Sequence, residues 1–217
     1  MKLISLLEKL EYTCLQGSTD QEVKNVIYDS RKVEEGSLFI CIRGAVVDGH
    51  KFVPDVVAKG AKVLIVEEAV EAPEDVTVIL VKDTRYAMAF ISAAYFGYPA
   101  EKLKTIGITG TKGKTTTTYM VKSILENAGY KVGLIGTIEA IIGDKVIPAK
   151  NTTPESYVIQ EYFHEMAEAG CDCVVMEVSS QGLMLHRTAG IPFEIGIFTN
   201  LGRDHIGPNE HKDLADY

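Results

Sequence analysis

Residues 105–117 read TIGITGTKGKTTT, and this stretch decides the fold of the second half of the chain. The apolar and β-branched residues 105–109 predict a strand, and residues 115–128 predict a helix. Gly110 and Gly113 lie between these two elements, where glycine lets the backbone curl and direct its N–H groups at phosphate oxygens. The start of the helix adds unpaired donors and a partial positive charge. This order of strand, loop and helix predicts a phosphate-binding loop.

The spacing of this loop is a shortened variant of the general P-loop. The general pattern has a glycine where this chain has Ile108, which leaves the form G-x-x-G-K-T. The dinucleotide-binding fingerprint does not fit, because Gly107, Gly110 and Gly113 are spaced by three. A Gly/Thr turn without a ligand is the plain alternative. The agreement of strand, loop, Lys-Thr pair and helix favours the phosphate loop over that turn.

The loop also predicts how phosphates and a metal ion are held. We expect Lys114 to reach the β- and γ-phosphates and the Thr115 hydroxyl to bind Mg²⁺. The predicted nucleotide-binding residues are Gly110, Thr111, Lys112, Gly113, Lys114, Thr115 and Thr116.

A metal site beside such a loop needs an acidic residue at the end of a neighbouring strand. Glu177 has this position near the carboxyl end of the strand predicted over 171–178, where ligands of parallel sheets bind. Asp204 and His205 follow the strand predicted over 193–200 and form a second polar cluster at the same edge. Position therefore supports Glu177 first and His205 second.

Composition excludes several classes of protein. The chain has 217 residues, of which 46% are hydrophobic and 24% charged, as in ordinary soluble globular proteins. A net charge of −8 leaves no overall basic surface for nucleic acid or an anionic membrane. No apolar run approaches the ~18 residues of a membrane span, and the N-terminus lacks a secretory pattern. We expect a cytoplasmic protein with reduced cysteines that neither binds nucleic acid nor inserts into a membrane.

The order of predicted elements divides the chain into two α/β halves. Strand-like runs alternate with helical stretches, which is typical of βαβ units in a mostly parallel sheet. The fold class is a small N-terminal α/β domain over 1–98, followed by a P-loop-type, mostly parallel domain over 99–217. The first half contains predicted helices over 2–11, 51–59 and 84–97, and strands over 38–42, 62–66 and 77–81. The second half adds a strand over 131–136, a hairpin turning at Gly143-Asp144, and a helix over 155–169.

Several motifs together resemble those of the Mur ligases, ATP-dependent amide-forming enzymes of bacterial cell-wall synthesis. The resemblance runs from about residue 27 to residue 217. The loop at 109–117 is shared across that family, whereas the NTTP and EVSS…HR segments in combination with DSR are more specific. The matching segments outside the loop are DSR at 29–31, GSLF at 36–39, NTTP at 151–154, EVSS at 177–180, HR at 186–187 and TNLGRDH at 199–205.

The resemblance implies a site for each substrate. Residues 1–98 are expected to hold the UDP end of a UDP-N-acetylmuramoyl dipeptide, and 99–217 to be an incomplete ATP-binding domain. The domain that binds the incoming diamino acid is expected to be absent, so meso-diaminopimelate and lysine both remain open. The implied substrate-binding residues are Ser30, Asn151, Thr152, Thr153, Ser179 and Arg187. The implied metal ligands are Thr115, Glu177 and His205, and the implied catalytic residues are Lys114, Glu177 and His205.

The implied reaction is a phosphoryl transfer from ATP to the substrate's terminal carboxylate, which makes an acyl phosphate. The amine of the diamino acid then displaces phosphate while the protein positions groups and neutralises charge. We expect a monomer whose 217 residues alone are inactive and expose an apolar sheet edge. The alternatives are another Mur-type ligase, either cyanophycin-synthetase-like or D-alanyl-D-alanine-adding, and a non-catalytic nucleotide-binding module.

Overall fold

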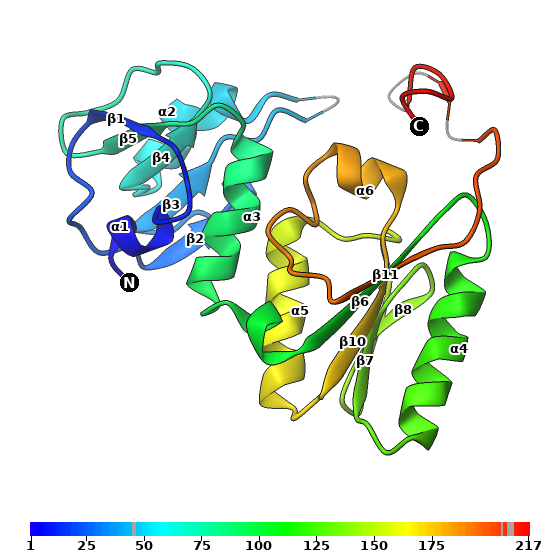
Figure 1. Cartoon of the computed structure of the whole chain (residues 1–217). Coiled ribbons are helices and arrows are strands. Elements are labelled where there is room, and N and C mark those ends of the chain that lie inside the picture. The colour runs from blue at the N-terminus through cyan, green and yellow to red at the C-terminus, as the bar shows by residue number, and fades with distance from the viewer. Residues whose placement is uncertain (45–46, 205, 208–210) are drawn as a thin grey trace. The chain divides into compact units, whose positions relative to one another are not determined.

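The computed structural model describes residues 1–44, 47–204, 206–207 and 211–217 (Figure 1). The chain divides into two compact units, Met1–Tyr95 and Phe96–Tyr217, and each contains its own sheet. Most strand pairs in both sheets are parallel, and helices cover the sheets. The α/β fold class expected from the sequence is therefore confirmed.

The first unit contains a five-stranded sheet in the order β1-β5-β4-β3-β2. Strands β2 to β5 run parallel, and β1 joins the edge antiparallel to β5. The strands are β1 (Thr13–Gln16), β2 (Asn25–Ile27), β3 (Ser37–Ile40), β4 (Val63–Val66) and β5 (Thr77–Leu80). The helices are α1 (Leu3–Leu6), α2 (Val53–Ala58) and α3 (Thr84–Tyr95), with 3-10 turns at Ser30–Lys32 and Gly49–Phe52.

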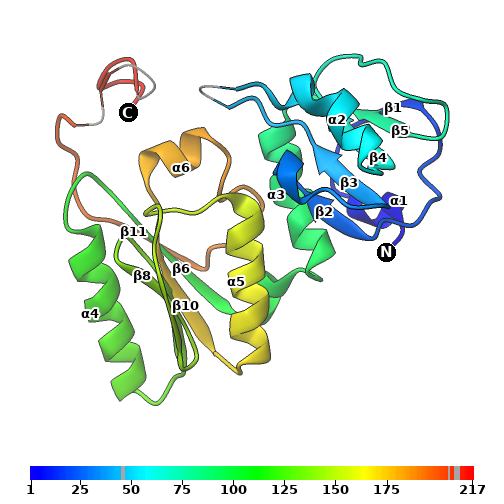
Figure 2. The ribbon, with the colours of Figure 1, turned by 180° about the vertical axis from the view of Figure 1, so that it is seen from behind.

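Both faces of this sheet are buried, which explains why β3 and β4 are continuous apolar runs. Phe39 and Leu64 lie in a core cluster with Val53 and Val56 of α2. Leu38 and Ile40 alternate with Phe39 along β3, so their side chains point to the opposite face. Helices α1 and α3 contact each other and lie on that side (Figures 1 and 2).

The helix expected over residues 2–11 is wrong in length. The leucines at 3, 6 and 7 are buried as the spacing predicted, but α1 contains four residues only. The N–H groups of Leu3 and Ile4 donate to the carbonyls of Gln21 and Thr19, so a neighbouring segment holds the start of the chain. Strands β1 and β2 were not predicted, because β1 is mostly exposed and β2 spans three residues.

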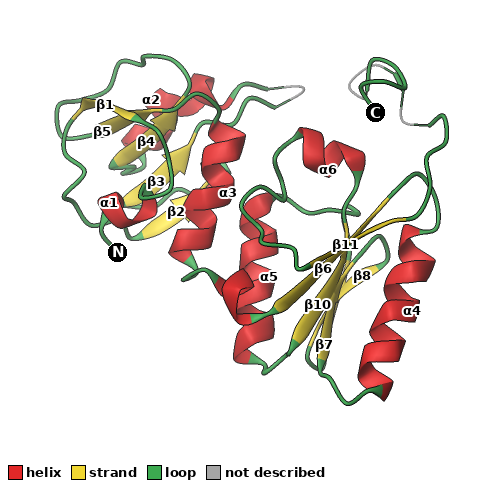
Figure 3. Cartoon of the chain, viewed as in Figure 1, coloured by secondary structure: helices red, strands yellow, loops and turns green. Residues whose placement is uncertain are grey.

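The second unit contains a six-stranded sheet in the order β11-β6-β10-β7-β8-β9 (Figure 3). The first four of these strands are parallel, and the β8-β9 hairpin continues the sheet antiparallel to β7. The strands are β6 (Lys104–Thr109), β7 (Val132–Ile135), β8 (Glu139–Ile142), β9 (Lys145–Pro148), β10 (Cys173–Glu177) and β11 (Ile195–Phe198). The helices are α4 (Lys114–Asn127), α5 (Ser156–Glu168) and α6 (Ser180–Met184), with a 3-10 turn at Pro99–Lys102. The hairpin turns at Gly143 as predicted.

Helices α4 and α5 cover opposite faces of this sheet (Figures 1 and 2). Phe163 and Met166 of α5 share a core cluster with Cys171. Cys173 belongs to a different cluster, against which Val121 of α4 packs. The two cysteines are free and buried.

The outer edge of this sheet is apolar and exposed, as expected from the sequence. Strand β11 pairs with β6 on one side only. Ile195 is 52% exposed and Phe198 is 64% exposed. In the part of the chain that the structure describes, none of the helices has the length and hydropathy needed to span a bilayer.

Candidate nucleotide and metal site

The carboxyl ends of four parallel strands meet at one edge of the second sheet. Strand β6 leads into the loop at 110–113, and Glu177 closes β10 directly beside Ile108 of β6. Strand β7, which pairs with β10 on its other side, is followed by Gly136 and Thr137. The edge strand β11 is followed by Thr199-Asn200. This is the position at which open parallel sheets bind their ligands.

The loop itself depends on its two glycines. Gly110 has φ of 129° and Gly113 has φ of 84°, conformations that L side chains rarely adopt. A Cβ on Gly110 would also lie 2.2 Å from the Thr199 hydroxyl oxygen. Helix α4 begins at Lys114, so the N–H groups of its first turn have no partner within the helix. The ammonium of Lys114 lies back across the loop, where it donates to the carbonyls of Gly110 at 2.6 Å and Thr111 at 3.3 Å.

Glu177 and Thr115 contact each other beside the glycine loop. The Glu177 side chain is 1% exposed and accepts hydrogen bonds from the Thr115 hydroxyl at 3.0 Å and from the Thr137 backbone N–H at 2.8 Å. The Thr137 hydroxyl lies 3.0 Å from the same carboxylate. A carboxylate and a hydroxyl beside a phosphate loop are the oxygen ligands that Mg²⁺ prefers, with water and phosphate completing its shell. These residues therefore fit the ion.

A larger protein-only metal centre is not present among the residues that the structure describes. They contain no group of three or more His, Cys, Asp or Glu side chains that could hold an ion. His205, predicted as a metal ligand and catalytic residue, lies outside the described residues.

Gly136 and Thr137 were not predicted from the sequence as part of this site. A Cβ on Gly136 would lie 2.6 Å from Glu177 Oε1, so only glycine leaves room for the carboxylate there. The Thr137 hydroxyl lies 3.0 Å from that of Thr152, which links the metal side of the site to the NTTP segment. The available signal was position: a Gly-Thr pair follows the buried strand β7 just as it follows β6.

A cavity of about 320 Å³ opens beside the loop. It brings together Lys114 and five of the predicted substrate-binding residues, whereas Ser30 belongs to the other unit. The described residues that line it include three cationic side chains and no carboxylate. The lining consists of Lys114, Thr137, Lys150, Asn151, Thr152, Thr153, Ser179, Ser180, Gln181, Arg187 and Tyr217. Such a lining suits an anionic ligand.

Thr153 organises the wall of this cavity. Its buried hydroxyl donates to the Glu177 carbonyl at 3.0 Å and accepts from the Ser179 N–H at 2.9 Å. Its carbonyl accepts from Arg187 at 3.0 Å, and Glu155 pairs with the same guanidinium at 3.1 Å. The Ser179 hydroxyl caps α6. The NTTP and EVSS segments and the arginine therefore meet through hydrogen bonds.

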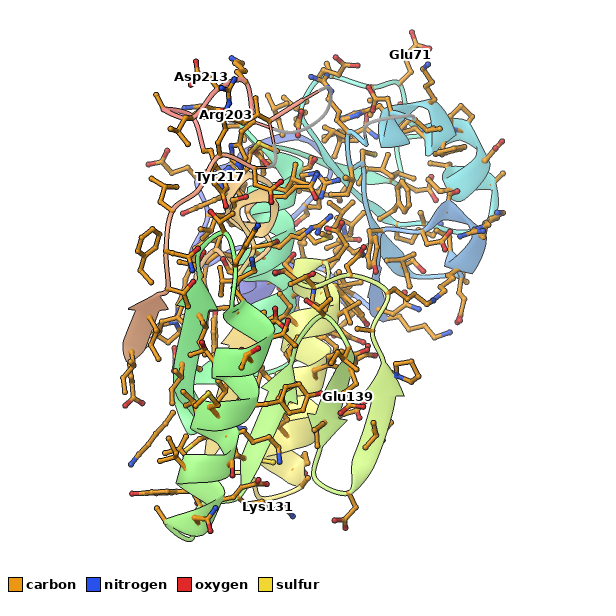
Figure 4. The ribbon with its side chains drawn as sticks, turned by 90° about the vertical axis from the view of Figure 1, so that its right-hand side faces the viewer. Glu71, Lys131, Glu139, Arg203, Asp213 and Tyr217 are labelled. Carbon is orange, nitrogen blue, oxygen red and sulfur yellow. The ribbon has the colours of Figure 1, made fainter. Side chains whose placement is uncertain are left out.

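Two tyrosines from different segments lie near the loop. Tyr119 of α4 donates to Glu139 of β8 at 2.8 Å, and burial followed by this carboxylate raises the pKa of Tyr119 to about 12. Tyr217 donates to the Thr111 hydroxyl at 2.9 Å. Figure 4 labels Glu139 on the hairpin beside α4 and Tyr217 on the C-terminal segment beyond the start of α4.

The first unit contains its own cavity around the DSR segment, of about 480 Å³. Ser30 lines it together with Tyr28, Phe39 and Phe52, among others. The Arg31 guanidinium beside Asp29 lowers the pKa of that carboxyl to about 2. Aromatic side chains beside a hydroxyl and peptide groups are suited to a flat, polar ring.

Comparison with known proteins identifies relatives along the chain. The family described as Mur ligase middle domain matches residues 108–217, and the one described as Mur ligase family, catalytic domain, matches residues 22–96. The UDP-N-acetylmuramoyl-L-alanyl-D-glutamate–2,6-diaminopimelate ligases of Clostridium perfringens (strain 13 / Type A) and Clostridium tetani (strain Massachusetts / E88) are 53% and 48% identical. Both alignments cover 100% of this chain, and 44% and 45% of those relatives.

A solved structure of a UDP-N-acetylmuramoyl-L-alanyl-D-glutamate–2,6-diaminopimelate ligase is also similar. It superposes with a TM-score of 0.81 at 25% identity, covering 100% of this chain and 43% of that protein. The chain thus spans less than half the length of the relatives it matches.

Proposed function

Because the chain belongs to the Mur ligase family, we propose that it forms part of an ATP-dependent ligase of peptidoglycan precursor synthesis. That enzyme joins a diamino acid to UDP-N-acetylmuramoyl-L-alanyl-D-glutamate. The relatives named above are 2,6-diaminopimelate ligases, which supports diaminopimelate over lysine as the added residue. The expected monomeric state and cytoplasmic location remain predictions, the latter supported by four free cysteines.

The observation that carries the proposal is the contact between the Thr115 hydroxyl and the buried Glu177 carboxylate at the mouth of the glycine loop. A buried carboxylate that accepts hydrogen bonds from a hydroxyl and an N–H group can instead bind a cation through one of its oxygens. Thr115 and Glu177 would hold Mg²⁺, which neutralises charge on the phosphates when bound. The N–H groups at the start of α4 and the Lys114 ammonium would receive the phosphate oxygens.

The substrate carboxylate must come close to the γ-phosphate for the reaction to occur. The cationic cavity supports this arrangement, because Lys114 lines it together with the predicted dipeptide-binding residues Asn151, Thr152 and Arg187. Two anions approach each other there, and the lysine and arginine side chains lower the repulsion between them. The described side chains thus bind and orient the reactants, while the phosphoryl group moves to the carboxylate.

The proposed acyl phosphate explains why ATP is needed. A carboxylate is a poor electrophile, and its phosphorylation supplies a leaving group that the amine of the diamino acid displaces. Recognition of that amino acid is assigned to the part of the enzyme beyond these residues. We propose that the UDP end of the substrate binds in the cavity around Ser30, which supports a division of labour between residues 1–98 and 99–217.

Calorimetry on the 217-residue chain tests the proposal. We expect binding of ATP with Mg²⁺, and a loss of roughly tenfold or more in affinity for Lys114→Ala, since bonds to charged groups contribute about 1.5–3 kcal/mol. Lys122→Ala is the matched control, because Lys122 lies on the same helix and pairs with Glu126 away from the loop. Unchanged ATP binding by Lys114→Ala contradicts the phosphate-loop assignment.

The muramoyl ligand is tested separately. We expect UDP-muramoyl dipeptide to bind more tightly than UDP-muramoyl tripeptide. A clear preference for the tripeptide would move the chain to a ligase acting later on the peptide stem.

A further inference from the structure

The loop at 110–113 forms hydrogen bonds with Thr199 and Asn200, the two residues that follow strand β11. We propose that Asn200 is a positioning residue that fixes the backbone of this loop, and that Thr199 assists it. This inference rests on the proposed function, because the loop is assigned to ATP. Neither residue is needed to touch the nucleotide.

The Asn200 side chain forms hydrogen bonds with both backbone polar groups of Lys112. Its Oδ1 accepts from the Lys112 N–H at 3.0 Å, and its Nδ2 donates to the Lys112 carbonyl at 2.9 Å. The Asn200 carbonyl also accepts from the Thr111 N–H at 3.0 Å. The amide side chain offers a donor and an acceptor side by side, whereas an ionised aspartate offers acceptors only and leucine offers neither.

Thr199 closes the same contact from the preceding position. Its hydroxyl donates to the Lys112 carbonyl at 2.8 Å, and its N–H donates to the Thr109 carbonyl at 2.9 Å. Gly110 passes so close that a Cβ there would lie 2.8 Å from the Asn200 carbonyl oxygen. The loop backbone and the 199–200 backbone are therefore in direct contact, without intervening side chains.

The N–H groups that Asn200 occupies differ from those at the start of α4. Those of Thr111 and Lys112 point at Asn200 and are occupied. The N–H groups in the first turn of α4 have no partner within the helix and can bind phosphate. Because these hydrogen bonds fix the loop before the ligand binds, its free N–H donors are already in place. This lowers the conformational entropy that is lost on binding.

The test measures exchange and affinity on the same chain. The rate of hydrogen exchange at the Lys112 amide, measured by NMR without nucleotide, shows whether Asn200 protects this N–H group. We expect slow exchange in the wild type and at least tenfold faster exchange in Asn200→Ala. We also expect the Kd for ATP with Mg²⁺ to rise roughly tenfold, because binding must then also order the loop.

Matched variants separate positioning from general stability. Asn127→Ala removes an amide-to-carbonyl bond at the far end of α4, and we expect wild-type affinity. Thr199→Ser keeps the hydroxyl and should bind ATP as the wild type does, whereas Thr199→Val should bind severalfold more weakly. If Asn200→Ala does not fold, the difference in ATP affinity between Thr199→Ser and Thr199→Val still tests whether these contacts position the loop.

Each result has a defined meaning. Equal Lys112 exchange in the wild type and Asn200→Ala, or equal affinity of Thr199→Val and Thr199→Ser, overturns the inference. Failure of the wild type to bind ATP refutes the proposed function instead, and the exchange measurement still decides whether Asn200 protects the Lys112 amide.

Discussion

Replacement of Gly136 by alanine tests whether Glu177 must lie where the structure has it. Gly136 does not have a left-handed φ, so alanine is acceptable to the backbone there. The new Cβ would lie 2.6 Å from Glu177 Oε1, whereas ordinary van der Waals contact begins near 3.4 Å. The carboxylate must therefore move by about 0.8 Å, which disturbs its hydrogen bonds with Thr115 and Thr137.

The cost of that shift can be estimated from the surroundings of Glu177. The side chain is 1% exposed, so it cannot move into solvent. Overpacking destabilises the folded state by about 1–3 kcal/mol. Replacing glycine also lowers the conformational entropy of the unfolded chain, which stabilises the fold by about 0.4–1 kcal/mol. We expect a net destabilisation of about 1–2 kcal/mol. A displaced metal ligand should weaken Mg²⁺-dependent ATP binding roughly 10- to 100-fold, as do other changes around metal ligands.

Calorimetric titration of ATP at several Mg²⁺ concentrations, together with urea unfolding, measures both effects. Gly196→Ala is the matched control, because Gly196 also lies in the second sheet and a Cβ there meets nothing within 4 Å. We expect that control to remain within about 0.5 kcal/mol of the wild type and to keep its affinity. A folded Gly136→Ala chain with wild-type Mg²⁺ dependence would refute the role of the Glu177 carboxylate.

Two further predictions concern titratable groups. Cys14 is exposed, whereas burial, together with nearby carboxylates, raises the pKa of Cys41 to about 12. A thiol reagent at pH 8 should therefore modify one cysteine per native chain quickly. The Cys14→Ser variant should lose that fast phase. Two fast thiols would contradict the buried positions of the others. Asp29 has a pKa lowered to about 2, so its contribution to stability is present above pH 4 and is lost as the pH falls towards 2. Asp29→Asn should flatten the acid side of the stability profile by under about 1 kcal/mol, because its partner Arg31 is largely exposed, and urea unfolding from pH 2 to 6 measures it.

Local patterns predicted the parts of the site that depend on neighbouring residues along the chain. The loop at 110–113 could be predicted because the two glycines, the Lys-Thr pair and the flanking strand and helix are contiguous. The position of Glu177 followed from a simple rule about the carboxyl ends of parallel strands. The helix over 2–11 was wrong because apolar spacing reports which leucines are buried, and not how many residues remain helical around them.

The contacts between segments could not be predicted in the same way. The roles of Gly136, Thr137 and Asn200 depend on strand order: β7 and β6 flank β10, and β11 lies beside β6. Several strand orders are compatible with the same alternating run of strands and helices, and each brings different loops together. Short or exposed strands such as β1 and β2 carry too little pattern to be recognised.

The sequence by itself determined that this chain contains α/β units, a glycine loop at the start of α4 and the motifs of its family. Those properties reside in the order of residues along the chain, because backbone conformation and helix starts depend on nearby side chains. Only the tertiary structure decided that Glu177 contacts Thr115, that Gly136 leaves room for it, and that Asn200 grips Lys112. These contacts join residues far apart in sequence, and the pairing and packing of the sheet bring them within hydrogen-bonding distance.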